Sequence, residues 1–464
     1  MKLFNSLTRK KEEFIPLVEG QVSMYNCGPT VYNFIHVGNA RPLVVFDTLR
    51  RFFIYRGYDV KFVVNFTDID DKLINKAKEE NITVEEVADR YIKAFKEDAQ
   101  ALSVYDYNTI HPKATDYISQ MIQFIGELEK KGAAYAVDGN VYFSVDSAKD
   151  YGKLSKKNID ELLSGARIEV NVEKRNPLDF VLWKKEKPGE PSWDSPWGKG
   201  RPGWHIECSV MAKTLLGETI DIHSGGEDLQ FPHHENEIAQ SETLSGKPFA
   251  NYWLHNGMLF VDNQKMSKSL GNFFTLKEIK EEYDLEVLRF FLLSAHYRSP
   301  INFSREVMDQ NMHGLERLYN AKKHLEYCME SSKDADSKAS TDFISKIDAF
   351  KNDFIESMED DINTADAIAA VFDLVKFTNS EISENSAVSD IKYAYNTLME
   401  LAKVLGILTK SEEIPDEDIL RLIEERTEAR SARDFKRADE IRDELKEKGI
   451  ILEDTKDGVK WKRV

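Results

Sequence analysis

Strand-like and helix-like segments alternate through the first hundred residues, and this alternation limits the possible folds more than any other feature of the sequence. Residues 22–27 have the pattern of a strand, residues 43–56 carry helical apolar spacing, and residues 59–66 form a short apolar run typical of a buried strand. Residues 83–86 form a capping box that predicts a helix over 83–102. Strands separated by helices pair in parallel, so we expect a doubly wound α/β sheet.

The second half of the chain first interrupts this alternation and then replaces it with helices. Residues 135–145 predict a hairpin, and the following stretch to residue 203 is irregular and rich in proline, which indicates an insertion. The alternation then resumes with a strand, a helix and a strand, expected over 219–223, 232–244 and 251–261. Four amphipathic helices follow and predict an antiparallel bundle: 305–331, 341–358, 365–381 and 388–405.

These patterns divide the chain into six predicted parts. The expected fold is α/β, with a Rossmann-type parallel sheet, an all-α bundle and a small mixed α/β domain at the end. The last part contains two charged helices and a short hairpin. The predicted parts are the first half of the Rossmann domain (1–132), the connective insertion (133–203), the second half of the Rossmann domain (204–262), a loop region (263–304), the helical bundle (305–410) and the C-terminal domain (416–464).

The chain of 464 residues is acidic, with 63 Lys plus Arg against 81 Asp plus Glu and a formal charge of −18. This balance argues against a protein coated in basic surface for nucleic acid. The charge is uneven, however, because residues 421–464 hold 13 basic and 12 acidic side chains. Four of these cations surround Trp461, where an aromatic side chain could stack on an exposed base or simply pack in the hairpin.

Three cysteines, Cys27, Cys208 and Cys328, cannot form a disulfide framework. We therefore expect a reducing, cytoplasmic compartment, in which paired cysteines more often bind a metal or take part in catalysis. Cys328 lies in a predicted bundle helix and is expected to be a small buried apolar residue. The sequence contains no run of 18 apolar residues, so we expect no membrane helix.

The sequence His36-Val37-Gly38-Asn39 lies between a predicted strand and the predicted start of a helix near Arg41-Pro42. A helix N-terminus after a glycine turn binds phosphate well, because its free N–H groups and its dipole both favour an anion. His36 could donate to a phosphate oxygen, and Gly38 would let an adenine approach the backbone. The alternative is an ordinary helix start with a surface histidine.

The sequence Lys265-Met266-Ser267-Lys268-Ser269 follows a predicted strand. Two lysines three residues apart suit a loop that clamps a polyphosphate and neutralises charge in the transition state. The alternative is a solvated basic turn.

The sequence Gly225-Gly226-Glu227-Asp228 follows another predicted strand. A glycine pair with an acid at the carboxyl end of a strand suits recognition of ribose hydroxyls in a nucleotide crevice. A tight acidic turn is the alternative.

Histidines and cysteines gather in one part of the chain, where five of the ten histidines lie between residues 205 and 255. His233 and Glu237 are spaced i and i+4, so they share a helix face if this segment is helical. Together with Cys27 and Cys208 they would supply the two thiolates, imidazole and carboxylate of a tetrahedral zinc site. The alternative is a pair of buried structural cysteines and a helix-capping histidine.

Taken together, these segments resemble the cysteinyl-tRNA synthetase family of class I aminoacyl-tRNA synthetases over essentially the whole chain. Residues 36–39 resemble the HIGH motif of the class, with Asn39 in place of its last histidine, and residues 265–269 are an unaltered KMSKS motif. The segments that resemble the cysteine-specific family are Tyr25-Asn26-Cys27-Gly28-Pro29-Thr30-Val31-Tyr32, Asn65-Phe66-Thr67-Asp68-Ile69-Asp70-Asp71-Lys72, Gly203-Trp204-His205-Ile206-Glu207-Cys208-Ser209 and Phe231-Pro232-His233-His234-Glu235-Asn236-Glu237.

The resemblance implies an enzyme that joins L-cysteine to tRNA(Cys) through cysteinyl-adenylate, using ATP with Mg²⁺. His36 and Lys268 would stabilise the transition-state charge, with Lys265 and Asn39 in support, and Asp228 would hold the ribose. The asparagine side chain does not ionise, so an acid role at position 39 is not expected. The implied ATP-binding residues are His36, Gly38, Asn39, Gly226, Asp228 and Lys268.

The resemblance also implies one zinc ion per chain that binds the substrate thiol, with Cys27, Cys208, His233 and Glu237 as ligands. Zinc lowers the pKa of a coordinated thiol, and serine cannot supply the same bond. Such a site can reject the analogue by roughly 10⁴-fold without an editing domain. The candidates for lining the cysteine pocket are Thr67, Trp204 and His223.

The family resemblance further implies a monomer, in which residues 263–304 are the KMSKS loop and stem-contact region and residues 416–464 bind the anticodon. Two other functions stay open. One is a ligase that passes cysteine to an amino-sugar, although such ligases lack the final domain. The other is a non-catalytic relative that binds RNA or metal, which the intact KMSKS motif disfavours.

Overall fold

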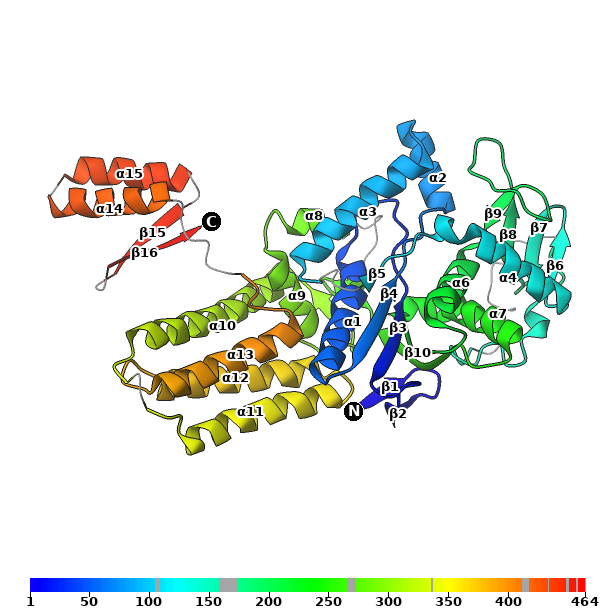
Figure 1. Ribbon diagram of the computed structural model, residues 1–464. Helices are drawn as coiled ribbons and strands as arrows, with labels where there is room; N and C mark the ends of the chain where they lie inside the picture. Colours follow the sequence, from blue (N-terminus) through cyan, green and yellow to red (C-terminus); the bar gives the residue numbers. More distant parts are fainter. Residues whose placement is uncertain are drawn as a thin grey trace. The chain divides into compact units, whose positions relative to one another are not determined.

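A computed structural model describes nine segments of the chain (Figure 1): 1–104, 109–157, 173–265, 273–334, 337–410, 417–432, 434–447, 450–455 and 458–463. The chain forms two compact units, Met1–Leu408 and Thr409–Val464, which are described separately. Among the described residues, no helix combines the length and the apolar character needed to cross a membrane.

The first unit is built on a five-stranded parallel sheet with the order β11-β10-β3-β4-β5. The crossover after β3 is α1, which contacts β3, β4, β10 and β11 and so covers one face of the sheet. This arrangement confirms the predicted Rossmann-type α/β fold. Its elements are β3 (Gln21–Asn26), α1 (Val37–Tyr55), β4 (Asp59–Val64), α2 (Asp71–Glu80), α3 (Val84–Ala101), β5 (Thr109–Ile110), α6 (Trp204–Leu216), β10 (Ile220–Gly226), α7 (Glu235–Ser245) and β11 (Ala250–Asn256). A hairpin of β1 (Lys2–Asn5) and β2 (Lys10–Glu13) precedes the sheet.

The insertion forms its own four-stranded antiparallel sheet, with the order β6-β7-β8-β9. The predicted hairpin is confirmed as β6 (Ala134–Val137) and β7 (Asn140–Phe143), and both turn residues, Asp138 and Gly139, have positive φ as a tight hairpin requires. The expectation of an irregular stretch to residue 203 is wrong for its described residues, since β8 (Phe180–Lys185) and β9 (Gly200–Pro202) complete this sheet. The helix α4 (Ile118–Lys130) precedes it, and short turns of helix lie at Ala114–Tyr117 and Val145–Ser147.

The segment after β10 also differs from expectation, because the strand predicted over 251–261 is two strands. β11 pairs with β10, whereas β12 (Leu259–Val261) pairs with β13 (Gln264–Lys265) and β14 (Ile301–Phe303) in a separate sheet. The break falls at Gly257, where a Cβ atom would lie 2.5 Å from the carbonyl oxygen of Arg298. Local apolar spacing cannot reveal such an approach between distant segments.

The four predicted bundle helices are confirmed as α10 (Arg305–Ser331), α11 (Thr341–Glu359), α12 (Thr364–Glu381) and α13 (Val388–Leu405), shown in yellow-green to orange in Figure 1. Ser304, Ser340 and Asn363 cap the first three through side-chain oxygens that accept N–H groups of the first turn. Two shorter helices, α8 (Leu276–Ile279) and α9 (Leu285–Leu293), connect the sheet of β12 to the bundle, and α13 packs against α1.

The second unit contains α14 (Glu417–Ser431), α15 (Phe435–Glu447) and the antiparallel strands β15 (Ile450–Thr455) and β16 (Gly458–Arg463). These elements match the two charged helices and the hairpin expected from the sequence. A small core of Leu422, Ile441, Leu445, Ile450 and Leu452 holds the unit together.

Candidate active site and metal centre

A cleft of about 420 Å³ lies at the carboxyl ends of β3, β10 and β11, where open parallel sheets bind their ligands. The segments that line it come from six distant parts of the sequence. Seven of the predicted site residues are in its lining: Cys27, His36, Gly38, Asn39, Trp204, Gly226 and Asp228.

The His36–Asn39 segment forms the first turn of α1 rather than the loop before it. The helix begins at Val37, His36 occupies the N-cap position, and the Asn39 side-chain oxygen accepts the His36 N–H at 3.3 Å. The predicted start near Arg41-Pro42 is therefore too late, because proline is typical of the first helical position but here lies inside the helix. The first turn of α1 consequently lines the cleft with His36, Gly38 and Asn39.

The residues after the KMSKS motif pair with this first turn. Val37 N donates to the Phe274 carbonyl at 3.1 Å, and Leu276 N donates to the Ile35 carbonyl at 2.9 Å. The imidazole of His36 contacts the ring of Phe273, with centroids 4.8 Å apart. Of the motif itself, the structure describes only the backbone of Lys265, at the end of β13, and Lys268 lies outside the described residues.

Gly226 and Asp228 lie where β10 ends. Gly226 is the last residue of the strand, and Glu227–Leu229 form a single short turn of helix that carries Asp228 at the edge of the cleft. A carboxylate at the carboxyl end of a parallel strand is well placed to accept hydrogen bonds from ribose hydroxyls.

Side chains of Cys27, Cys208, His233 and Glu237 meet beneath the cleft, and their possible ligand atoms all lie within 4.8 Å of one another. The sulfur atoms of Cys27 and Cys208 are 3.7 Å apart, Cys27 Sγ is 3.6 Å from Glu237 Oε1, and His233 Nε2 is 3.1 Å from the same oxygen. A tetrahedral zinc ion with Zn–S bonds of about 2.3 Å separates its two sulfurs by about 3.8 Å. The donor types and these spacings fit zinc.

Cys27 is placed by its neighbours in the chain. Its N–H donates to the Ser224 carbonyl at 3.0 Å, which holds it beside β10. The next residue, Gly28, donates to Asn65 Oδ1 at 2.9 Å, and a Cβ atom there would lie 1.7 Å from the Asn65 carbonyl oxygen. Only glycine permits this approach, so the Cys27-Gly28 pair fixes where the thiol stands.

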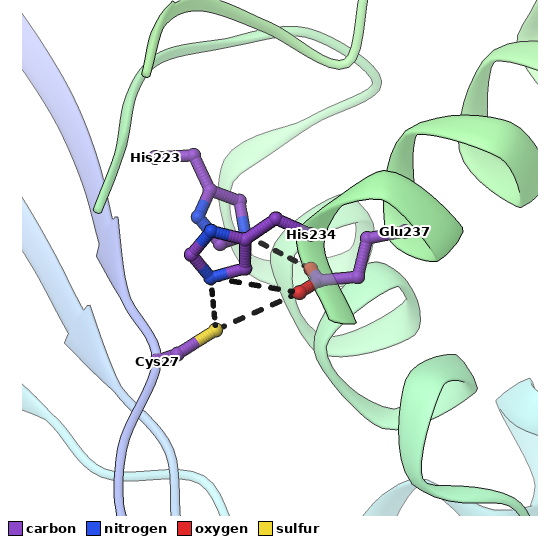
Figure 2. A group of neighbouring side chains, drawn as sticks. All are labelled: Cys27, His223, His234 and Glu237. Carbon is purple, nitrogen blue, oxygen red and sulfur yellow. Dashed lines mark hydrogen bonds and ion pairs between the residues drawn. The ribbon is translucent and has the colours of Figure 1, made fainter. Parts of the chain in front are cut away.

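A second set of donors shares two members with the first (Figure 2): Cys27, His223, His234 and Glu237. His234 Nε2 is 3.3 Å from Cys27 Sγ, and His223 Nε2 is 2.9 Å from Glu237 Oε2. Sequence reasoning did not assign His234 to the site. Its signal was the His233-His234 pair, but a helical i, i+4 argument selects only the first of the two.

Burial sets the protonation preferences of this cluster. It raises the pKa of the Cys27 thiol, which also faces Cys208 and Glu237, and it raises the pKa of the Glu237 carboxyl. Burial lowers the pKa of His233 well below its usual value and that of His223 to about 3, so both imidazoles are neutral. Without a cation the acids favour their neutral forms, whereas a divalent ion would stabilise thiolate and carboxylate.

The three candidates for the cysteine pocket contact this cluster or its supports. The Trp204 indole is 38% exposed and stacks on the His233 ring, with centroids 4.2 Å apart. His223 bonds to Glu237, and the Thr67 hydroxyl donates to Glu207 Oε2 at 2.8 Å, next to Cys208. Of the three, Trp204 lines the cleft, whereas His223 and Thr67 are fully buried, His223 against Glu237 and Thr67 against Glu207.

Family models match most of the chain. Residues 13–313 match the model described as "tRNA synthetases class I (C) catalytic domain", and residues 353–409 match the "DALR domain". Residues 415–461 match "Cysteinyl-tRNA ligase anticodon binding domain".

Two curated relatives are similar over their whole length. Cysteine--tRNA ligase of Finegoldia magna is 59% identical over 465 residues, and that of Clostridioides difficile is 56% identical over 466 residues; each alignment covers 100% of both chains.

Solved structures share the fold at low identity. Methionyl-tRNA synthetase of Mycobacterium tuberculosis in complex with methionyl-adenylate has a TM-score of 0.59 at 15% identity, covering 83% of this chain and 89% of that one. The LeuRS ternary complex of Agrobacterium radiobacter K84 has a TM-score of 0.60 at 12% identity, covering 85% of each chain.

Proposed function

The chain belongs to the cysteine–tRNA ligase family of class I aminoacyl-tRNA synthetases, and we propose on this premise that it joins L-cysteine to tRNA(Cys) through cysteinyl-adenylate, with zinc-dependent recognition of the cysteine thiol. One observation carries the proposal. Cys27 lies in the lining of the nucleotide cleft and also belongs to the buried donor cluster, so an amino acid held at the cluster would lie beside ATP.

In the first step the carboxylate of cysteine attacks the α-phosphorus of ATP and pyrophosphate leaves. In the second, the 2′-hydroxyl of the terminal tRNA adenosine attacks the carbonyl carbon of the adenylate, and AMP leaves with cleavage of the acyl–phosphate bond. Catalysis rests on positioning and electrostatics. His36 and Lys268 stabilise the charge on the phosphates, with Asn39 and Lys265 in support. Gly38, Gly226 and Asp228 hold the nucleotide, which binds together with Mg²⁺, and Asp228 accepts from the ribose.

Cys27, Cys208, His233 and Glu237 would hold zinc, and we prefer them to the set with His223 and His234 because two thiolates are favoured zinc ligands. When bound, zinc lowers the pKa of the substrate thiol and so favours its thiolate form. His223 orients the Glu237 carboxylate through its 2.9 Å hydrogen bond, and Trp204 covers the His233 ring.

The final domain distinguishes tRNA from an amino-sugar as the proposed acceptor of the cysteinyl group. The match of residues 415–461 to an anticodon-binding domain supports tRNA, since the amino-sugar ligases lack this part. Residues 263–304 are proposed as the KMSKS loop and stem-contact region, and the enzyme is proposed to act as a monomer in the cytoplasm. The three cysteines, all unpaired, are compatible with a reducing compartment.

The test is ATP–pyrophosphate exchange with cysteine against serine, with zinc measured in the same sample and tRNA and amino-sugar charging measured afterwards. We expect about one zinc per chain, exchange with cysteine at least roughly 10⁴-fold more efficient than with serine, and charging of tRNA alone. Exchange without cysteine preference would contradict the zinc-thiolate proposal. Absence of any exchange would favour a non-catalytic relative.

The ligand set is tested by Cys208→Ser, with Cys328→Ser as the matched control. Both cysteines are buried on helices, but Cys328 lies on α10 and belongs to neither donor set. Cys208→Ser should lose zinc and reduce exchange by at least about a hundredfold, because it removes one of the proposed direct zinc ligands. Cys328→Ser should keep both within twofold, and full zinc in Cys208→Ser would remove that residue from the site.

A further inference from the structure

Arg41 is a cation buried where a helix normally disfavours one. It lies in the second turn of α1, close to the positive end of the helix dipole, and its side chain is fully buried. Burial of a guanidinium is costly unless its donors are satisfied, so its partners indicate what the residue is for.

Those partners are backbone carbonyl oxygens of two other segments, one of which lines the cleft with Gly257 and Met258. Nη1 donates to Gly257 at 2.6 Å and to Met258 at 3.0 Å, and Nη2 donates to Ser299 at 2.5 Å. The planar fork of arginine suits carbonyls in two different segments, which a single ammonium cannot reach together.

The two segments form one unit that leads to the KMSKS motif. Gly257 N donates to the Tyr297 carbonyl at 2.9 Å, and Ile301 N donates to the Met258 carbonyl at 3.1 Å. They continue into the parallel pair β12 and β14, and β13 ends at Lys265, the first residue of the motif.

This unit also forms part of the cleft. Asn256, Gly257, Met258 and Leu259 belong to its lining, together with His36, Gly38 and Asn39 of the first turn of α1. Arg41 therefore connects two walls of one cleft. One wall is the first turn of its own helix, and the other is the 256–259 segment, to which Arg41 is hydrogen-bonded through carbonyl groups.

We propose that Arg41 is a positioning residue for ATP: by holding the carbonyls of Gly257, Met258 and Ser299, it sets the distance between the 256–259 wall and the first turn of α1. This inference rests on the proposed function only in taking the cleft as the ATP site. It assigns Arg41 no contact with ATP and no role in binding cysteine or zinc.

The test compares Arg41→Lys with Arg289→Lys. Arg289 is also fully buried and also donates to backbone carbonyls, at 2.6 Å to Leu405 and 3.1 Å to Leu102, but it does not line the cleft. Both variants therefore lose donation to backbone carbonyls in different places, and Arg289→Lys also alters the ion pair of Arg289 with Asp47. Calorimetric binding of ATP with Mg²⁺, zinc per chain, thermal midpoint and the KM for cysteine are measured for both.

We expect Arg41→Lys to raise the Kd for ATP at least tenfold and to leave zinc content and the KM for cysteine within twofold. Arg289→Lys should lower the thermal midpoint but keep the Kd for ATP within twofold. Unchanged ATP affinity in folded Arg41→Lys, or an equal loss in Arg289→Lys, would overturn the inference.

A second variant keeps the test decisive if Arg41→Lys does not fold. Gly257→Ala displaces the same wall, because its Cβ would lie 2.5 Å from the Arg298 carbonyl, and it should weaken ATP binding in the same way. Normal ATP affinity in Gly257→Ala would then overturn the inference. Wild-type protein that binds ATP without cysteine-dependent exchange would contradict the proposed function alone.

Discussion

His255 shows how deeply the donor cluster extends into the protein. Its Nε2 lies 2.8 Å from Nδ1 of His234, whose other nitrogen faces Cys27, and its Nδ1 lies 2.8 Å from the hydroxyl of Ser6. Burial, with smaller contributions from His223 and Arg9, lowers the pKa of His255 to about 3. The folded protein therefore keeps this ring neutral throughout the physiological range.

His255 consequently predicts a dependence of stability on pH. The unfolded chain takes up a proton near the ordinary histidine pKa of about 6.5, but the folded chain does not until the pH approaches about 3. The contribution of His255 to the free energy of unfolding is fully present above about pH 6.5. It is lost as the pH drops, by about 1.4 kcal/mol per pH unit between about pH 6 and 4. Urea unfolding of metal-free protein at several pH values should show a slope reduced by that amount in His255→Gln.

The exposed histidine His313, on α10, provides the control for that measurement. Its side chain is 68% exposed, so His313→Gln should leave the slope of wild-type protein unchanged. An unchanged slope in His255→Gln would show that the ring gains a proton in the folded state as readily as in the unfolded chain.

Residues of the site differ in how far the sequence alone could reveal them. The i, i+4 spacing brings His233 and Glu237 to one helix face, but Cys27 and Cys208 are 181 residues apart and no spacing rule relates them. Arg41 gave no signal, because its carbonyl partners lie 216 to 258 residues further along the chain. The family resemblance related Cys27 to Cys208, and only the fold related Arg41 to its carbonyl partners.

At the scale of elements, a buried cluster of charges joins three helices. Asp47 of α1 is fully buried and accepts from Arg50 at 2.6 Å, from Arg51 at 2.7 Å and from Arg289 of α9 at 2.9 Å. Arg289 also donates to the Leu405 carbonyl at the end of α13. The helix that begins at the active site is therefore connected to the bundle through one carboxylate.

Removal of that carboxylate should destabilise the first unit strongly. Asp47→Asn leaves buried arginines without their anion, a change that costs about 3–5 kcal/mol in comparable sites. We expect the thermal midpoint to fall by at least about 6 °C. Asp360→Asn is the control, since its pair with Lys11 is exposed and contributes under about 1 kcal/mol. Equal midpoints for the two variants would mean that the cluster does not hold the helices together.

The elements that the sequence predicted well are those with local causes. The helix α10 begins and ends at the predicted residues, because caps and apolar period lie within its own segment. The strands β8 and β9 escaped prediction, since they form only through pairing with each other and with β7. Proline-rich composition was a poor guide there, because Pro202 takes the last position of an edge strand, where proline is tolerated.

At the scale of the whole molecule, charge is unevenly distributed along the chain. Residues 421–464 hold 13 basic and 12 acidic side chains, whereas the chain as a whole carries −18. Nucleic acid repels a strongly acidic surface, so residues 421–464, with a net charge of +1, are better able to approach RNA than the acidic remainder of the chain. The global charge, which argued against a nucleic-acid partner, does not describe this C-terminal segment.

Truncation after Leu408 tests this division, because Met1–Leu408 is a compact unit that contains the cleft and the donor cluster. We expect the truncated protein to retain zinc and cysteine-dependent pyrophosphate exchange within about twofold, since neither set of contacts is removed. Its kcat/KM for charging tRNA(Cys) should fall at least about a hundredfold, the equivalent of about 2.7 kcal/mol of lost binding. Both assays on the same sample separate damage to the first unit from loss of the second. Charging within twofold of the full chain would show that residues 409–464 do not bind the tRNA in the rate-determining complex.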